Sequence, residues 1–176
     1  METFLELLKI FIPALLVMLT AWLVIRNMLH DDQERRRQDL LLQTVKTVTP
    51  VRLQAYERVV LFLERISPVQ AVFRVMEPDM SPARLQAALV QAIREEFEHN
   101  IAQQIYISPE AWVLVRNARE ETVRLINASF ISINEKSTAN DLAKTILENW
   151  SAMEKNPVQS AVDYLKNEVR QLFGEA

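Results

Sequence analysis

The chain has 176 residues, of which 49% are apolar, 24% are charged, one is glycine and none is cysteine. Phosphate-binding loops, tight hairpins and dinucleotide-binding turns need backbone conformations that glycine adopts most easily, so a single glycine argues against all of them. The 20 basic and 23 acidic residues leave a net charge of −3, which gives nucleic acid no bulk electrostatic attraction. The composition therefore favours an all-α fold without a nucleic-acid partner.

The first predicted element is an apolar helix near the amino terminus. Residues 10–25 contain no charged side chain, whereas charges interrupt every later apolar run. A helix from Leu5 to Ile25 would rise about 31 Å, which matches a hydrocarbon core of about 30 Å. We therefore predict a single transmembrane helix within an anchor formed by residues 1–29. A cleavable signal peptide is the alternative, but the first residues are not basic, as such a peptide requires.

Basic residues flank the predicted span unequally. Lys9 precedes its centre, whereas four arginines follow it, namely Arg26, Arg35, Arg36 and Arg37. Because basic flanks are retained in the cytoplasm, the carboxyl-terminal body is expected on the cytoplasmic side of a bacterial inner membrane. The membrane bilayer is accordingly one expected partner.

The charged segment after the anchor predicts a helical stalk over residues 30–49, followed by a cytoplasmic helical bundle over residues 50–176. The stalk carries three consecutive arginines that are candidates for contact with lipid headgroups: Arg35, Arg36 and Arg37. Acidic residues are interleaved with them, so a solvated helix face is the simpler interpretation of this cluster. Binding of lipid or nucleic acid by these three arginines stays open as a further hypothesis on function.

Proline marks most of the helix starts in the body. Five of the seven prolines follow a Ser, Thr or Asn, and such a pair is typical of a helix amino terminus. These pairs are Thr49-Pro50, Ser67-Pro68, Ser81-Pro82, Ser108-Pro109 and Asn156-Pro157. Thr138 with Asp141 predicts one further start through a variant capping box.

The spacing of apolar residues between these starts is helical throughout the body. It predicts helices over residues 50–66, 68–76, 82–105, 109–134, 138–153 and 157–173. Each helix has an apolar stripe that must be buried, and a bundle of about five to six helices buries all of them.

One motif suggests metal chemistry. Glu96 and His99 have the Glu-x-x-His spacing by which di-iron proteins place two ligands on one helix face. Such a site needs a second copy of the motif, and the other histidine of the chain, His30, does not supply one. We therefore predict no metal site, with His99 paired to the carboxylate of Glu95 on the surface. A small metal-binding or enzymatic bundle that uses Glu96 and His99 is the alternative function.

The sequence also offers no set of catalytic residues. It has no cysteine, no Gly-x-Ser-x-Gly motif and no glycine-rich loop, so nucleophilic catalysis and phosphoryl transfer both lack their usual groups. We predict that the protein is not an enzyme and carries no cofactor.

Several arginines fall within the segment predicted to form a helix over residues 109–134. Arg116, Glu120 and Arg124 are spaced one turn apart and predict a ladder of ion pairs. Arg119 falls on the apolar stripe between Val115 and Val123. An arginine there must pair internally or open onto a binding groove, and the internal pair is the simpler interpretation.

Two stretches carry a family resemblance. The first stretch is residues 52–68 (RLQAYERVVLFLERISP), and the second comprises residues 93–100 (IREEFEHN), 103–108 (QQIYIS) and Ala111-Trp112. Both resemble a family of uncharacterised single-pass membrane proteins from Bacteroidetes-type bacteria. The resemblance implies a topology and no activity. Polar and apolar groups are closely interleaved in the first stretch, which favours a contact surface. The candidate partner-contact residues are Tyr56, Arg58, Tyr106, Trp112 and Arg119, with core packing as the alternative for the aromatic ones.

These observations together predict a membrane-anchored interaction or scaffold protein, a subunit or adaptor of an envelope-associated complex. We expect a protein partner because the chain combines an anchor with a helical body that has no catalytic groups. The sequence does not identify that partner, and a homo-oligomer stays open.

Overall fold

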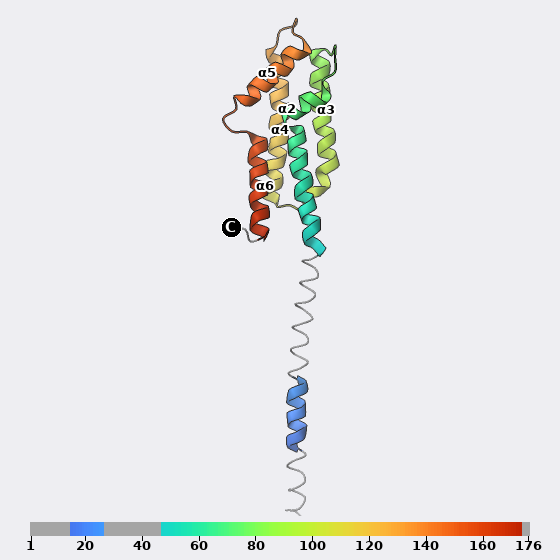
Figure 1. Ribbon diagram of the computed structural model, residues 1–176, viewed down its shortest axis with the longest axis vertical. Helices are drawn as coiled ribbons and strands as arrows, with labels where there is room; N and C mark the ends of the chain where they lie inside the picture. The colour runs from blue at the N-terminus through green and yellow to red at the C-terminus, as the bar shows by residue number, and fades with distance from the viewer. Residues whose placement is uncertain (1–14, 27–46, 174–176) are drawn as a thin grey trace, which may run out of the picture. The chain divides into compact units, whose positions relative to one another are not determined.

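The computed structural model describes residues 15–26 and 47–173 (Figure 1). Contacts divide the chain into two units, Met1–Thr49 and Pro50–Ala176. The described residues contain α-helices, one 3-10 helix and no strand, which confirms the predicted all-α class. Most of the predicted stalk, including Arg35, Arg36 and Arg37, lies outside the described residues.

In the amino-terminal unit, residues 15–26 are helical. The Thr20 hydroxyl lies 2.9 Å from the carbonyl oxygens of both Leu16 and Val17, and the Arg26 guanidinium lies 5.2 Å from the centre of the Trp22 ring system. Among the residues that the structure describes, no helix combines the length and the apolar character that a membrane crossing requires. The first ten residues of the predicted span, 5–14, lie outside that part of the chain.

The second unit is a helical bundle. Its first element is the part from Pro50 onward of a helix that covers residues 47–66. The elements that follow are α2 (Pro68–Val75), α3 (Pro82–Asn100), the 3-10 helix η1 (Ile101–Ile105), α4 (Pro109–Ser132), α5 (Ala139–Ser151) and α6 (Pro157–Phe173). These elements confirm the predicted helical bundle, with differences at several helix ends. The helix predicted over 82–105 ends as an α-helix at Asn100 and continues as η1, whereas α4 ends at Ser132 rather than at residue 134. The α5 helix ends at Ser151 rather than at residue 153, and α2 ends one residue earlier than predicted, at Val75.

Side-chain caps explain where most of these helices begin. The hydroxyls of Ser81 and Ser108 accept hydrogen bonds from the backbone N–H groups of Arg84 and Ala111, at 3.2 and 3.1 Å. In the same way, the Asn156 amide oxygen accepts from the backbone of Gln159. Thr138 and Asp141 form the predicted capping box, in which each side chain accepts from the other residue's backbone N–H.

One predicted start differs from the structure, and another lacks its side-chain cap. The α2 helix begins at Pro68 as predicted, but Ser67 makes no capping hydrogen bond through its side chain. Residues 47–49 are already helical, so the prediction of a helix start at Thr49-Pro50 was wrong. A proline removes one backbone hydrogen bond and does not by itself end a helix, which is why this pair misleads.

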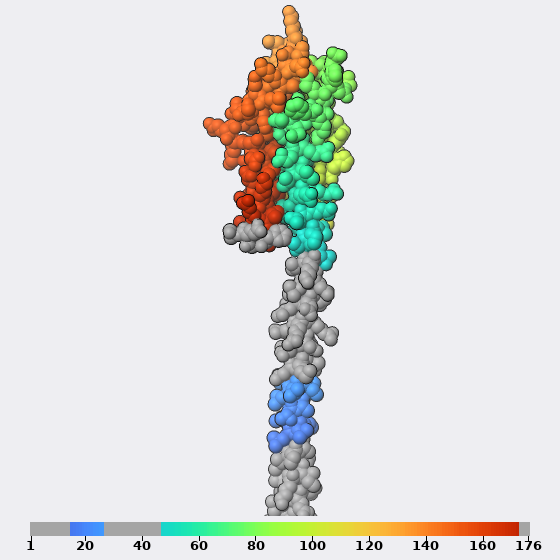
Figure 2. Space-filling view, in the orientation of Figure 1, coloured from blue at the N-terminus to red at the C-terminus, as the bar shows by residue number. Residues whose placement is uncertain are grey.

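The core runs the length of the bundle, and α4 packs against α3, α5 and α6 (Figure 1). In the space-filling view, the 47–66 helix (teal) covers the middle of one face, between α6 (red) and α3 (green) (Figure 2). The apolar stripes meet in one cluster. Its largest fully buried side chains include Phe62, Leu63, Ile66, Leu85, Leu89, Ile93, Ile126, Leu142, Ile146 and Leu165.

The connection between α2 and α3 turns sharply at Asp79, whose φ of 60° lies in the left-handed region. Glycine adopts this region at no steric cost, and Asp and Asn tolerate it better than other residues. The turn therefore forms at an aspartate in a chain whose single glycine is Gly174.

Candidate functional site: a groove between α3 and α4

A groove of about 430 Å³ lies between α3 and α4. Its apolar lining consists of Val90, Ile93 and Val123, of which Ile93 is fully buried in the core. Polar side chains complete the lining, namely Arg94 from α3 and Arg119, Glu120, Arg124 and Asn127 from α4. The volume falls in the range of natural binding pockets, about 300 to 1,000 Å³. Apolar side chains with several converging polar groups are the usual composition of such a site.

The Phe97 ring holds Arg119 in place. The guanidinium carbon of Arg119 lies 4.3 Å from the centre of that ring, and its Nη2 lies 3.7 Å from a carboxylate oxygen of Glu120. Phe97 is itself fixed by a stacked contact with Trp112, with 5.5 Å between ring centres. A guanidinium that stacks on a ring keeps its N–H donors free at its edge. Arg119 is therefore both satisfied internally and open to the groove, where 31% of its side chain is exposed.

The charge of the groove is opposite to that of the chain. Three guanidinium groups and one carboxylate line it, whereas the whole chain has a net charge of −3. Arg124 is paired outside the lining, since its Nη1 lies 2.8 Å from Glu121. Arg94 forms no ion pair with any residue that the structure describes. A local excess of basic groups on an acidic protein favours an anionic ligand.

These contacts correct the predicted ladder of ion pairs. Among the described residues, Arg124 pairs with Glu121 and Glu120 lies beside Arg119, so neither Arg116 nor Arg124 pairs with Glu120 as the spacing predicted. Glu120 lies instead beside Arg119, which stacks on Phe97 of α3. The i, i+4 rule considers neighbours on the same helix and cannot take account of an aromatic ring from another helix.

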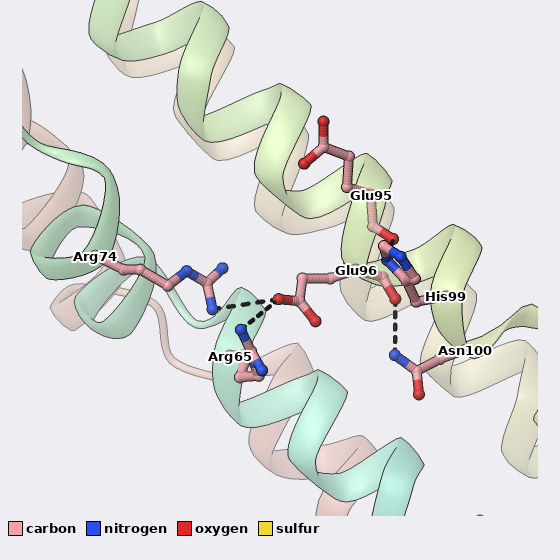
Figure 3. Close-up of polar contacts among 6 residues, drawn as sticks. All are labelled: Arg65, Arg74, Glu95, Glu96, His99 and Asn100. Atoms are coloured by element: carbon pink, nitrogen blue, oxygen red, sulfur yellow. Dashed lines mark hydrogen bonds and ion pairs between the residues drawn. The ribbon is translucent and has the colours of Figure 1, made fainter.

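Glu96 and His99 do not act together (Figure 3). One Glu96 oxygen lies 2.8 Å from Arg65 and 3.5 Å from Arg74, so this carboxylate joins the 47–66 helix, α2 and α3. The His99 Nδ1 atom instead lies 2.7 Å from the backbone carbonyl oxygen of Glu95, rather than at its carboxylate as predicted. Among the described residues, no group of three or more His, Cys, Asp or Glu side chains is placed to hold a metal ion.

A second groove, of about 570 Å³, lies between the 47–66 helix and α3 and includes Arg58, Arg65, Glu96 and His99. Arg58 is exposed there, as a contact residue must be. Basic and acidic groups both line this groove, and its most buried carboxylate already binds two guanidinium groups. Its two arginines and two glutamates balance, so it lacks the basic excess of the α3–α4 groove.

Two of the predicted contact residues lie in the core. Tyr56 is 3% exposed and Trp112 is 9% exposed, so core packing, the alternative for these aromatic residues, describes both. Neither offers a surface to a partner. Their polar neighbours in the sequence had suggested a surface, but those neighbours lie on other faces of the same helices.

The hydroxyl of Tyr56 is buried near the charged groups of Glu168 and Arg52. Its buried hydroxyl makes no hydrogen bond with a described residue. Burial first, and then the neighbouring Glu168 carboxylate, raise the pKa of Tyr56 to about 12, against an opposing effect of Arg52. Glu168 accepts a hydrogen bond of 3.0 Å from the Ser108 hydroxyl.

Tyr106 is partly exposed, and its backbone carbonyl accepts a hydrogen bond from Arg52. Of the five predicted contact residues, Arg119 alone lines the α3–α4 groove. Sequence reasoning missed its neighbour Arg94, although Val90 and Arg94 are one turn apart on the predicted helix.

Comparison with known proteins identifies a family and no activity. No curated protein and no solved structure matches the chain. A family model described as a family of unknown function (DUF7935) matches residues 2–172. This match confirms the resemblance to an uncharacterised family and carries neither a membrane location nor a source organism. Because the match covers nearly the whole chain, the protein belongs to this family of unknown function.

Proposed function

We propose that this chain is a membrane-tethered interaction protein whose helical bundle docks a partner protein through the α3–α4 groove. The observation that carries the proposal is the groove itself, which combines an apolar lining with Arg94 and Arg119. Helix surfaces that present apolar side chains beside unpaired charges are typical of peptide-recognition grooves. The bundle acts as a docking module and not as an enzyme in this proposal.

The helical residues 15–26 support the tether. Apolar side chains are exposed all around this segment, among them Leu16, Val17 and Met18, and a helix of this kind needs an apolar environment. The Thr20 hydroxyl bonds to backbone carbonyls of its own helix, as hydroxyls do in membranes. The arginines that succeed the segment support the proposed location at the inner face of a bacterial cytoplasmic membrane.

The docking part is tested with a photoreactive amino acid at position 127 of the full chain in its own cells. A discrete cross-linked adduct is expected there, and Arg119→Glu should abolish it. Position 159 on α6, outside the groove, is the matched control and should give no such adduct. Absence of an adduct at 127, or the same adducts at both positions, would overturn the docking proposal.

The tether is tested separately. The full chain should stay in the membrane fraction after carbonate extraction, whereas a chain without residues 2–26 should be released. A reporter fused after Ala176 should behave as a cytoplasmic protein. Release of the full chain by carbonate would contradict the tether without affecting the docking proposal.

A further inference from the structure

We propose that the α3–α4 groove recognises a helical segment of the partner in which a carboxylate lies one turn from a branched aliphatic side chain. This inference rests on the proposed docking function and adds the chemistry of the docked segment. It is carried by the order in which charged and apolar groups follow one another along the groove.

The order follows from the register of the two helices. The α3 and α4 helices run antiparallel and side by side (Figure 1). Towards one end of the pair, Arg119 lies on Phe97. Towards the other end, the Gln86 amide donates a hydrogen bond of 2.7 Å to Asn127. Between these two contacts, the antiparallel register brings the turn of α3 that carries Arg94 near the turn of α4 that carries Arg119, and the turn that carries Val90 near the turn that carries Val123.

The groove therefore has successive levels. Arg94 and Arg119 form a basic level, with Glu120 beside Arg119. Val90 and Val123 form an apolar level, next to which Arg124 is already paired with Glu121. Asn127 begins a level of amide side chains. Val90 and Arg94 are four residues apart, as are Arg119 and Val123, so the basic and apolar levels are about 6 Å apart along the helix axes. Residues i and i+4 of a docked helix have the same spacing.

A carboxylate fits the basic level better than a neutral group does. Arg94 has no ion pair among the described residues, and Arg119 is held by Phe97 with its nearest carboxylate 3.7 Å away. Guanidinium groups bind a carboxylate through two parallel N–H donors, and Arg119 is already oriented by its ring contact. A carboxylate that enters between Arg94 and Arg119 gains these bonds without first breaking a strong pair.

A protein segment fits the groove better than a lipid surface does. The apolar level lies between two helices, where Ile93 is fully buried and Val90 and Val123 are partly buried. A side chain on a narrow helix can reach this recess, whereas a flat array of headgroups meets the exposed arginines first. Charge complementarity and the recessed apolar level together favour the acidic, aliphatic helix.

The test uses stapled alanine-rich helical peptides and the full chain in detergent micelles. The first peptide has Glu and Leu at positions i and i+4. Three comparison peptides replace Glu by Gln, replace Leu by Ala, or move Leu to i+2. Binding is measured by fluorescence anisotropy of a labelled peptide. The first peptide should bind at least about tenfold more tightly than each of the others, as one charged contact or one buried side chain allows.

Variants of the chain connect this preference to the groove. Arg94→Gln and Arg119→Gln should each reduce the preference for Glu over Gln to less than about twofold. Arg119→Lys, which keeps the charge without the planar stacking, should reduce it in part. Arg84→Gln, on the same helix but outside the groove, should leave it unchanged. Circular dichroism of each variant establishes that it folds.

Three results would overturn the inference: equal binding of all four peptides, a preference for Glu that survives in both Arg→Gln variants, or displacement of the first peptide when anionic lipid, but not zwitterionic lipid, is added to the micelles. If the adduct at position 127 forms in cells and the peptides show no preference, this inference fails and the docking proposal stands. If the adduct is also absent, both fail.

Discussion

The guanidinium of Arg119 lies over the ring of Phe97, with 4.3 Å between its central carbon and the ring centre. Phe97 stacks in turn on Trp112 and makes a tilted contact with Phe62, at 5.5 and 5.9 Å between ring centres. Phe97 thus contacts both the charged side chain at the groove and the aromatic side chains of the core.

Phe97→Ala should therefore destabilise the bundle strongly. Loss of a buried phenylalanine leaves a cavity and is expected to lower the free energy of unfolding by about 3 to 5 kcal/mol. Phe73→Ala is the matched control, because 80% of Phe73 is exposed, and it should change the value by less than about 0.5 kcal/mol. Urea denaturation measures both, and similar losses in the two variants would contradict the packing described.

Glu96→Gln should weaken the attachment of α2. The substitution removes the carboxylate charge that pairs with both Arg65 and Arg74. The Glu96 side chain is mostly buried, with 18% of it exposed. We expect a loss of about 1 kcal/mol that decreases at high salt, since both arginines are partly solvated. Glu148→Gln, which breaks the more exposed pair with Lys144, should cost less than about 0.5 kcal/mol. Equal costs in thermal unfolding would argue against a special role of Glu96.

Tyr56 should make the stability of the bundle fall at alkaline pH. Its folded-state pKa of about 12 exceeds the ordinary value of 10.0, so the neutral hydroxyl favours folding below pH 10 and this contribution is lost as the pH rises towards 12. The two-unit difference corresponds to about 2 to 3 kcal/mol.

Tyr56→Phe should remove that part of the alkaline loss and should be neutral or slightly stabilising at pH 7, because the hydroxyl has no hydrogen bond among the described residues. Tyr164→Phe, at a partly exposed position, should retain the full alkaline loss. Urea denaturation between pH 9 and 12 compares the three proteins, and identical curves for wild type and Tyr56→Phe would refute the assignment.

Thr138→Ala should destabilise α5 at its amino terminus by about 1 kcal/mol, the usual cost of a lost cap. Hydrogen bonds from the backbone N–H of Thr138 first, and then from its hydroxyl, lower the pKa of Asp141 below its ordinary value of 3.8. The ionised carboxylate therefore stabilises the fold above that value, and its contribution is lost as the pH falls below it.

The variant should consequently lose less stability between pH 4 and pH 2 than the wild type does. Ser67→Ala provides the control, since the Ser67 side chain makes no capping bond. It should cost less than Thr138→Ala and leave the acid dependence unchanged. The Thr138→Ala variant keeps the hydrogen bond from the backbone N–H of residue 138 to Asp141, so an unaltered acid dependence would show that the Thr138 hydroxyl contributes little.

The sequence was sufficient for the helices because their signals are local. Apolar spacing and the caps at Ser81, Ser108 and Thr138 lie within a few residues of the boundaries that they determine. The same signals failed at Thr49-Pro50, where the helical residues before the proline carry no mark of their own.

The candidate site could be predicted only in part, because its contacts join separate helices. The position of Arg119 on an apolar stripe pointed to a satisfied pair or a groove, but its partner Phe97 comes from α3. Arg94 gave no signal at all, since an exposed arginine on a helix is ordinary until the facing helix is known. The burial of Tyr56 likewise depends on neighbours distant in the sequence.

The left-handed turn at Asp79 has a consequence for natural sequence variation. A side chain branched at Cβ would be strained at a φ of 60°. Other members of the family should therefore have Asp, Asn or Gly at the position that corresponds to Asp79. Members with valine, isoleucine or threonine there should also differ in the number of residues between α2 and α3.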